Sequence, residues 1–186
     1  MKLVQSLSPL IFSLLVLISS STSNASVLED ACKSFAANHA DIGYDYCIRF
    51  FQADKGSATA DKIGLAAIAV KIATAAAKGT TKHIAALKAS EGDKRRKGCL
   101  SSCAEVYSSA VDNLGEAAKG IASRSAAGFQ DAVTVLSAAR DVPDTCEEGF
   151  RELGQPSPLA DDDAEFTKES AVALAVTSAI SPPTML

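Results

Sequence analysis

The feature that most constrains this chain is its alanine content, since 34 of the 186 residues are alanine. The apolar fraction is 47%, yet aromatic residues make up only 5% and tryptophan is absent. Alanine is the strongest helix former and is depleted in strands, so the composition predicts an all-α protein. The apolar content excludes collagen-like and disordered chains, and a net charge of −4 argues against a nucleic-acid binder.

A long helix is predicted over residues 58–90, where apolar residues recur every three or four positions. The predicted inward stripe consists of Ile63, Ala67, Val70, Thr74, Ala77, Thr81 and Ile84. Lys71, Lys78 and Lys82 share the opposite face, and Ser57 or Thr59 can cap the helix start. An apolar stripe with a polar back is typical of a helix in a bundle.

Further helices are predicted over residues 99–119, 129–139, 146–153 and from 161 to about 180. The second of the bundle helices carries Cys103, Tyr107, Ala110, Leu114 and Ala117 along one side. Residues 26–56 hold half of the aromatic residues and read as two short helices broken near Gly43. The predicted fold is an antiparallel four-helix bundle over residues 57–186 with an N-terminal helical hairpin extension.

The N-terminus has the pattern of a secretory signal peptide. Lys2 precedes an apolar run over residues 10–18, and small polar residues follow. The run is too short to span a membrane, which takes roughly 20 apolar residues. We expect cleavage after Ala25, which would leave one domain over residues 26–186 that is exported and has no membrane anchor.

Five cysteines in an exported chain are expected to pair. Cys32 and Cys47 flank the break in the hairpin, and Cys103 and Cys146 lie on two predicted bundle helices. Closing these loops is worth roughly 3 and 4 kcal/mol in the chain-entropy model. Cys99 lies one helical turn before Cys103, so it could replace Cys103 as the partner of Cys146, stay free, or crosslink two molecules.

No motif of a known catalytic site is present. The sequence lacks HExxH, GxGxxG, GxSxG and a phosphate-binding lysine loop. His39 and His83 are isolated, so we expect them to be solvated or packed, with no metal site and no cofactor. The acidic run at 161–163 is interpreted as stabilising a helix start, with one residue capping.

The sharpest basic run covers residues 94–97. It could contact an anionic partner surface or a cell-wall polyanion. A solvated helix start or loop is the simpler interpretation, and positive charge at a helix N-terminus is mildly unfavourable.

Three sequence blocks, in order behind a signal peptide, resemble the plant invertase and pectin methylesterase inhibitors. The first runs from Cys32 to Asp61, with Ser57 and Ala60 at family positions. The second is CAEVYSSAVDNLGEA from Cys103, and the third is SAARDVPDTCEEGF, which contains Cys146. The spacing of the first two cysteines resembles the subgroup that contains the plane-tree pollen allergen.

The resemblance implies a four-helix bundle with a helical hairpin, and it pairs Cys32 with Cys47 and Cys103 with Cys146, leaving Cys99 as an extra thiol. Members of the family are not enzymes. They block a carbohydrate-active enzyme in a one-to-one complex, so we expect a monomer in the apoplast or vacuole.

The resemblance also ranks the targets. Invertase inhibitors of the family insert a Pro-Lys-Phe loop, but the matching positions here are Ala127, Gly128 and Phe129. Pectin methylesterase is therefore the first target hypothesis. Acid invertase, with Phe129 as the candidate contact, is the second. A secreted, allergen-like binding module without an enzyme target is the third.

Overall fold

The computed structural model describes residues 27–180 and is helical apart from short connections. A first helix covers residues 27–38. It is followed by α2 (Tyr44–Gln52), the 3-10 turn η1 (Ser57–Thr59), α3 (Lys62–Ser90), α4 (Lys94–Ala122), α5 (Ala126–Arg140), α6 (Val142–Glu152) and α7 (Ala160–Ser178). The predicted signal peptide and its cleavage site lie outside the described residues.

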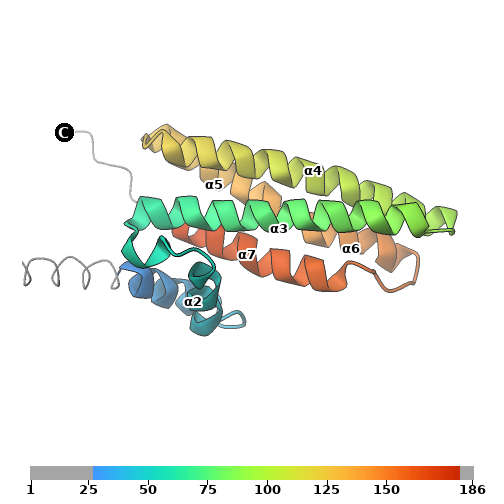
Figure 1. Cartoon of the computed structure of the whole chain (residues 1–186), viewed down its shortest axis with the longest axis horizontal. Coiled ribbons are helices and arrows are strands. Elements are labelled where there is room, and N and C mark those ends of the chain that lie inside the picture. The colour runs from blue at the N-terminus through green and yellow to red at the C-terminus, as the bar shows by residue number, and fades with distance from the viewer. Residues whose placement is uncertain (1–26, 181–186) are drawn as a thin grey trace, which may run out of the picture.

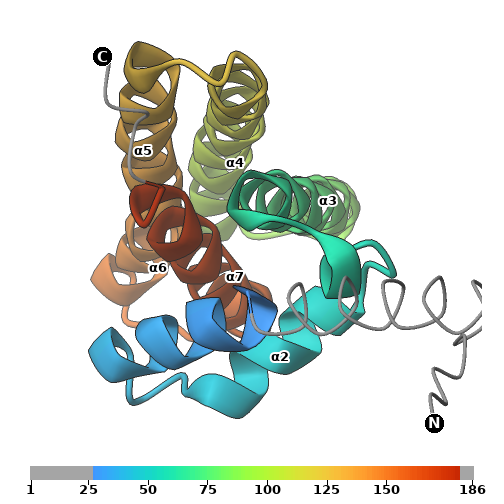
Figure 2. The same cartoon turned by 90° about the vertical axis from the view of Figure 1, so that its left-hand side faces the viewer.

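The helices form an elongated bundle with an arm at one end (Figure 1). Helix α4 packs on α3 and α5, and α7 packs on the same two helices from the other side. The shorter α5 and α6 follow one another along the bundle (Figure 1), and the end view shows them on the side away from α3 (Figure 2). The first helix and α2 form the arm beside α3 and α7. The predicted all-α bundle with an N-terminal helical hairpin is confirmed.

Side-chain caps define where the long helices begin. The Asp61 carboxylate accepts a hydrogen bond from the Gly64 N–H at 2.7 Å, so α3 starts at Lys62. Ser57 and Thr59 instead lie in the 3-10 turn, so the prediction that one of them caps this helix is wrong. Asp93 caps α4 in the same way and starts it at Lys94, five residues before the predicted position.

Helix α7 begins without a side-chain cap. Its N-cap residue is Leu159, and the acidic residues Asp161, Asp162 and Asp163 lie inside the first turn. The prediction that one of these acids caps the helix is therefore wrong. Negative charge in a first turn still interacts favourably with the helix dipole.

The core runs through the whole bundle, and α4 presents its predicted face to it. Cys103, Tyr107, Ala110, Leu114 and Ala117 are all buried. On α3 the buried face differs from the predicted stripe: it contains Leu65, Ala66, Ala69, Val70, Ala73, Ala77, Thr80 and Ile84. Ala67 is exposed. Alanine occurs on every side of α3 itself. Apolar periodicity alone therefore does not identify the face of α3 that packs against α4 and α7.

A glycine contact brings α4 and α5 together at one end of the bundle. A Cβ atom on Gly120 would lie 2.4 Å from the Gly128 carbonyl oxygen, and one on Gly128 would lie 2.5 Å from the Gly120 oxygen. Neither position has room for a side chain. The tight turn between these helices therefore depends on both glycines.

Candidate functional site

Two disulfides hold the elements that surround the bundle core. Cys32 is joined to Cys47 within the arm, and both are fully buried, with a Cα–Cα distance of 5.5 Å. Cys103 is joined to Cys146, which ties α4 to α6 at a Cα–Cα distance of 4.8 Å. These are the pairs that the family resemblance implies. Each bridge closes a loop and so limits the conformations of the unfolded chain.

Cys99 is the free cysteine among the described residues. It is partly buried, one turn before Cys103 on α4, and its thiol donates to the Gly149 carbonyl at 3.3 Å. Cys99 thus faces Gly149 on α6 while Cys103 faces Cys146, which is why the bridge uses Cys103.

The arm is fastened to the bundle by polar contacts as well as apolar ones. The Tyr46 hydroxyl donates to Glu165 Oε1 on α7 at 2.8 Å, and the Lys168 ammonium lies 5.6 Å from the centre of the Tyr46 ring. Lys71 on α3 pairs with Asp54 at 2.8 Å. The arm therefore has a fixed position against α3 and α7.

The residue predicted to contact a target, Phe129, follows the turn between α4 and α5. Phe129 is 4% exposed, so its ring lies in the core and would have to leave it to touch a partner. Its role as a target contact stays a prediction. The turn instead exposes Ser123, Arg124 and Ser125, with Arg124 in the left-handed region at φ 53°. Phe129 is the fourth residue of α5, and the helix period turns it inward.

The outward face of α3 is smooth and basic. Lys71, Ala75, Lys78, Gly79 and Lys82 are exposed, and the helix contains no acidic residue. A Cβ atom on Gly79 would meet nothing within 4 Å, so this surface is open. Small side chains between lysines allow another surface to approach the helix closely.

A buried acidic cluster lies between α4, α6 and α7. The Tyr107 hydroxyl donates to Asp163 Oδ1, and Asp163 is 2% exposed. Asp163 Oδ2 and Glu147 Oε1 are buried without a hydrogen-bond partner among the described residues. Burial, reinforced by the neighbouring Glu147, raises the pKa of Asp163 to about 8. Burial likewise raises the pKa of Tyr107. The sequence pattern does not indicate this cluster. Asp163 belongs to a run of three acids at a helix start, and all three look like solvated residues in the sequence.

A second acid on α7 is also perturbed. Burial, followed by the charge of Glu165, raises the pKa of Glu169 to about 7. Burial and the hydrogen bond to Glu165 raise the pKa of Tyr46 as well. Helix α7 therefore carries two carboxyl groups that favour the protonated state in the fold.

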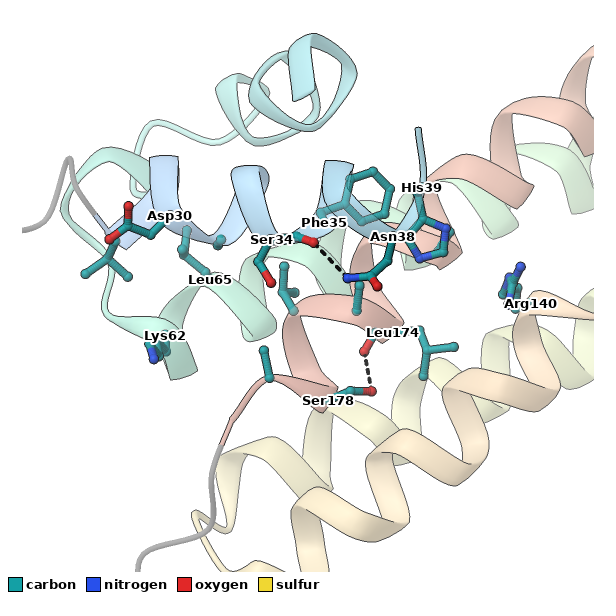
Figure 3. A pocket seen from close by; sticks show the side chains of 16 residues that line it. Asp30, Ser34, Phe35, Asn38, His39, Lys62, Leu65, Arg140, Leu174 and Ser178 are labelled. Carbon is teal, nitrogen blue, oxygen red and sulfur yellow. Dashed lines mark hydrogen bonds between the residues drawn. The ribbon is translucent and has the colours of Figure 1, made fainter. Parts of the chain in front are cut away.

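A pocket of about 560 Å³ lies between the first helix and the last turns of α7 (Figure 3). Its lining is largely apolar and includes Phe35, Leu65 and Leu174, with Lys62 and Arg140 among the charged residues. Figure 3 shows Lys62 and Arg140 at opposite ends. His39 is also in the lining and stacks on Phe35, with ring centroids 4.6 Å apart.

The remaining candidate groups are dispersed. His83 on α3 lies near the surface, with Nδ1 2.9 Å from Asp162 Oδ2. Within residues 27–180, no group of three or more His, Cys, Asp or Glu side chains is arranged to hold a metal ion. Helix α3 is long and apolar enough to cross a membrane, judged by length and composition. In this fold its buried residues pack against α4 and α7.

The family described as "Plant invertase/pectin methylesterase inhibitor" matches residues 26–176. The chain belongs to this family. It is therefore a protein inhibitor of pectin methylesterase or invertase, and not an enzyme.

Individual relatives carry both target names. A Platanus acerifolia protein named "Putative invertase inhibitor" is 32% identical over 178 residues, which cover 95% of this chain and 97% of that one. A "Pectinesterase inhibitor" from Actinidia deliciosa is 36% identical over 105 residues, or 56% of this chain and 55% of that one.

The fold agrees with a solved family structure. The crystal structure of a mutant form of a pectin methylesterase inhibitor from Arabidopsis superposes with a TM-score of 0.65 at 24% identity. The match covers 74% of this chain and 90% of that one. At this identity the likeness supports the fold and leaves the target open.

Proposed function

We propose that this inhibitor acts on pectin methylesterase and blocks its cleft sterically in a one-to-one complex. The outward face of α3 would lie across the cleft. No covalent step is needed, because a rigid surface that excludes the polysaccharide is sufficient.

The shape of α3 supports this role. The helix has 29 residues and is thus about 43 Å long, which is enough to cover an extended polysaccharide cleft. Its buried side is packed against α4 and α7, so the exposed side is presented by a rigid support. Exposed Ala75 and Gly79 leave room for close approach.

The observation that carries the choice of target is the burial of Phe129. The resemblance associates invertase inhibition with a Pro-Lys-Phe loop at the start of α5. Here the proline and lysine positions are Ala127 and Gly128, and the phenylalanine is 4% exposed. The α4–α5 turn thus offers no apolar side chain for insertion into a sucrose-sized cleft.

Inhibition of acid invertase is the second candidate. It is favoured by the Platanus relative, whose printed name is that of an invertase inhibitor and which matches almost the whole chain. Such inhibition would have to use contacts other than the Phe129 ring.

We further propose that the mature protein consists of residues 26–186 and acts in the cell wall, with the vacuole as the alternative destination. The signal-peptide pattern over residues 1–25 supports entry into the secretory pathway.

The test is a stoichiometric inhibition assay of the mature protein against both enzymes, repeated with Ala75→Arg and Ala138→Arg. Both alanines are exposed helix positions where arginine is well tolerated, so neither change should affect folding. Ala75→Arg should weaken inhibition of pectin methylesterase, whereas Ala138→Arg on α5 should not. No inhibition of pectin methylesterase at excess would overturn the proposal, and inhibition of invertase alone would establish the second candidate.

A further inference from the structure

We propose that the turn between α3 and α4 is a binding site for a linear polyuronate, that is, de-esterified pectin. The site, here called the basic tip, consists of Lys88, Lys94, Arg95 and Lys97. In Figure 1 this turn lies at the end of the bundle opposite the arm. The inference rests on the proposed function, because pectin methylesterase produces such a polyanion from its ester.

The acids of this segment are already occupied. Residues 88–97 contain five cations and only two acids, Glu91 and Asp93. Glu91 accepts from Arg96 Nε at 2.9 Å and from the Asp93 N–H at 2.9 Å. Asp93 accepts from the N–H groups of Arg95 and Arg96 as the cap of α4. The one ion pair of these two acids is Glu91 with Arg96, so five cations against two acids leave the segment with a net positive charge.

The cations of the basic tip remain available to a ligand. Lys94, Arg95 and Lys97 are exposed, and Lys88 is half-exposed. None of the four makes an ion pair within the part of the chain that the structure describes. Positive charge in a first helical turn opposes the helix dipole, and the single Asp93 cap offsets only part of the cost of three such cations. An external anion would offset more of it.

The backbone beneath the basic tip is held in place. Arg96 lies with its guanidinium 5.5 Å from the centre of the Phe150 ring and donates to the Gln155 side chain at 2.9 Å. The turn is closed by the Glu91 N–H, which donates to the Leu87 carbonyl at 3.0 Å. The cations are thus presented on a fixed base, which lowers the entropic cost of binding.

The surroundings favour a polyuronate over a protein surface. The exposed neighbours Ala89, Ser90, Gly92 and Gly98 are all small. Protein interfaces usually need a buried aromatic or aliphatic anchor, and the basic tip exposes none. A polyuronate carries a carboxylate on every sugar and many hydroxyl groups, so it needs closely spaced cations and no apolar anchor.

The experiment measures binding of the mature protein to polygalacturonate oligomers at low and high salt. The test variant replaces Lys94, Arg95 and Lys97 with glutamine. The matched control replaces Lys62, Lys78 and Lys82 with glutamine, which removes the same charge from cations spread along α3. Fully methyl-esterified oligomers serve as the uncharged ligand. Inhibition of pectin methylesterase is measured for the wild-type protein and the test variant.

We expect the test variant to bind polygalacturonate about tenfold more weakly, the loss expected when three solvent-exposed charge contacts are removed. The control should bind like the wild type, added salt should abolish binding, and the esterified oligomers should not bind. Equal weakening in both variants would show a nonspecific charge effect and overturn the site. Normal polygalacturonate binding with lost enzyme inhibition would also overturn it, by assigning the basic tip to a protein contact. Intact binding of polygalacturonate without any enzyme inhibition would reject the proposed function alone.

Discussion

The buried carboxyl group of Asp163 predicts that the fold loses stability as the pH rises. In the folded state its pKa is about 8, against 3.8 for an exposed aspartate. Between these values the native state holds a proton that the unfolded state has released. The contribution of Asp163 to the free energy of unfolding is therefore most favourable below pH 4, and it falls as the pH rises towards 8.

The size of the effect follows from the same shift. Each pH unit in this window costs about 1.4 kcal/mol for one group, so the change from pH 5 to pH 7 is about 3 kcal/mol. Asp163 is only 2% exposed, so solvent screens little of this cost. The physical origin is the loss of hydration, with the Glu147 carboxylate as the nearest like charge. Glu169 adds to the fall, because its pKa is also raised.

The perturbation is Asp163→Asn, which keeps the shape and an acceptor for the Tyr107 hydroxyl but has no proton to lose. We expect the variant to match the wild type within about 1 kcal/mol near pH 4, and its advantage to grow by about 3 kcal/mol between pH 5 and pH 7. Urea unfolding followed by circular dichroism, with disulfides intact, gives both values.

The control for this prediction is Asp161→Asn, the same chemical change at an exposed position in the same helical turn. It should leave the pH dependence unchanged, because an exposed carboxylate is hydrated in both the folded and the unfolded state. If the wild type and Asp163→Asn lose stability in parallel between pH 5 and pH 7, the reasoning about Asp163 is wrong.

Two further predictions concern packing and cysteine chemistry. Gly120→Ala should lower the free energy of unfolding by about 1–3 kcal/mol, because the added Cβ would meet the Gly128 carbonyl. Gly115→Ala on the same helix has open space around it and should raise the free energy of unfolding by up to about 1 kcal/mol. Equal effects of the two changes in urea unfolding would contradict the proposed contact. Cys99→Ser should leave thermal unfolding and the oligomeric state nearly unchanged. Cys146→Ser should cost about 4 kcal/mol by opening the bridge, and a stable, unaltered Cys146→Ser protein would refute the disulfide argument.

Apolar periodicity predicts the buried face of a helix when large apolar residues lie on one side only. It fails when small apolar residues lie on every side. Helix α4 has its large apolar residues on one face, which contains Cys103, Tyr107 and Leu114, and that face is buried as predicted. On α3 alanine occurs around the whole helix, so exposed Ala67 and buried Ala66 look alike in sequence. The hydrophobic gain from burying alanine is small, and it does not orient a helix by itself.

Cap assignment failed for a related reason. Ser57, Thr59 and Asp61 are all acceptable caps in sequence, and only the path of the chain from the arm into the bundle selects Asp61. At the start of α7 three consecutive acids are equally suited to a solvated first turn. Packing against α4 turns Asp163 inward to Tyr107, while His83 on α3 pairs with Asp162.

The sequence by itself determined the helical class, the arm, the family and the absence of a recognisable catalytic motif, because these depend on local propensity, spacing and residue identity. The tertiary structure alone decided that Phe129 is buried, that the pKa of Asp163 is raised, and that Lys94, Arg95 and Lys97 form no ion pair within residues 27–180. These properties depend on which residues from distant helices surround each group. Desolvation and charge pairing are set by those neighbours, and no local pattern of residues specifies them.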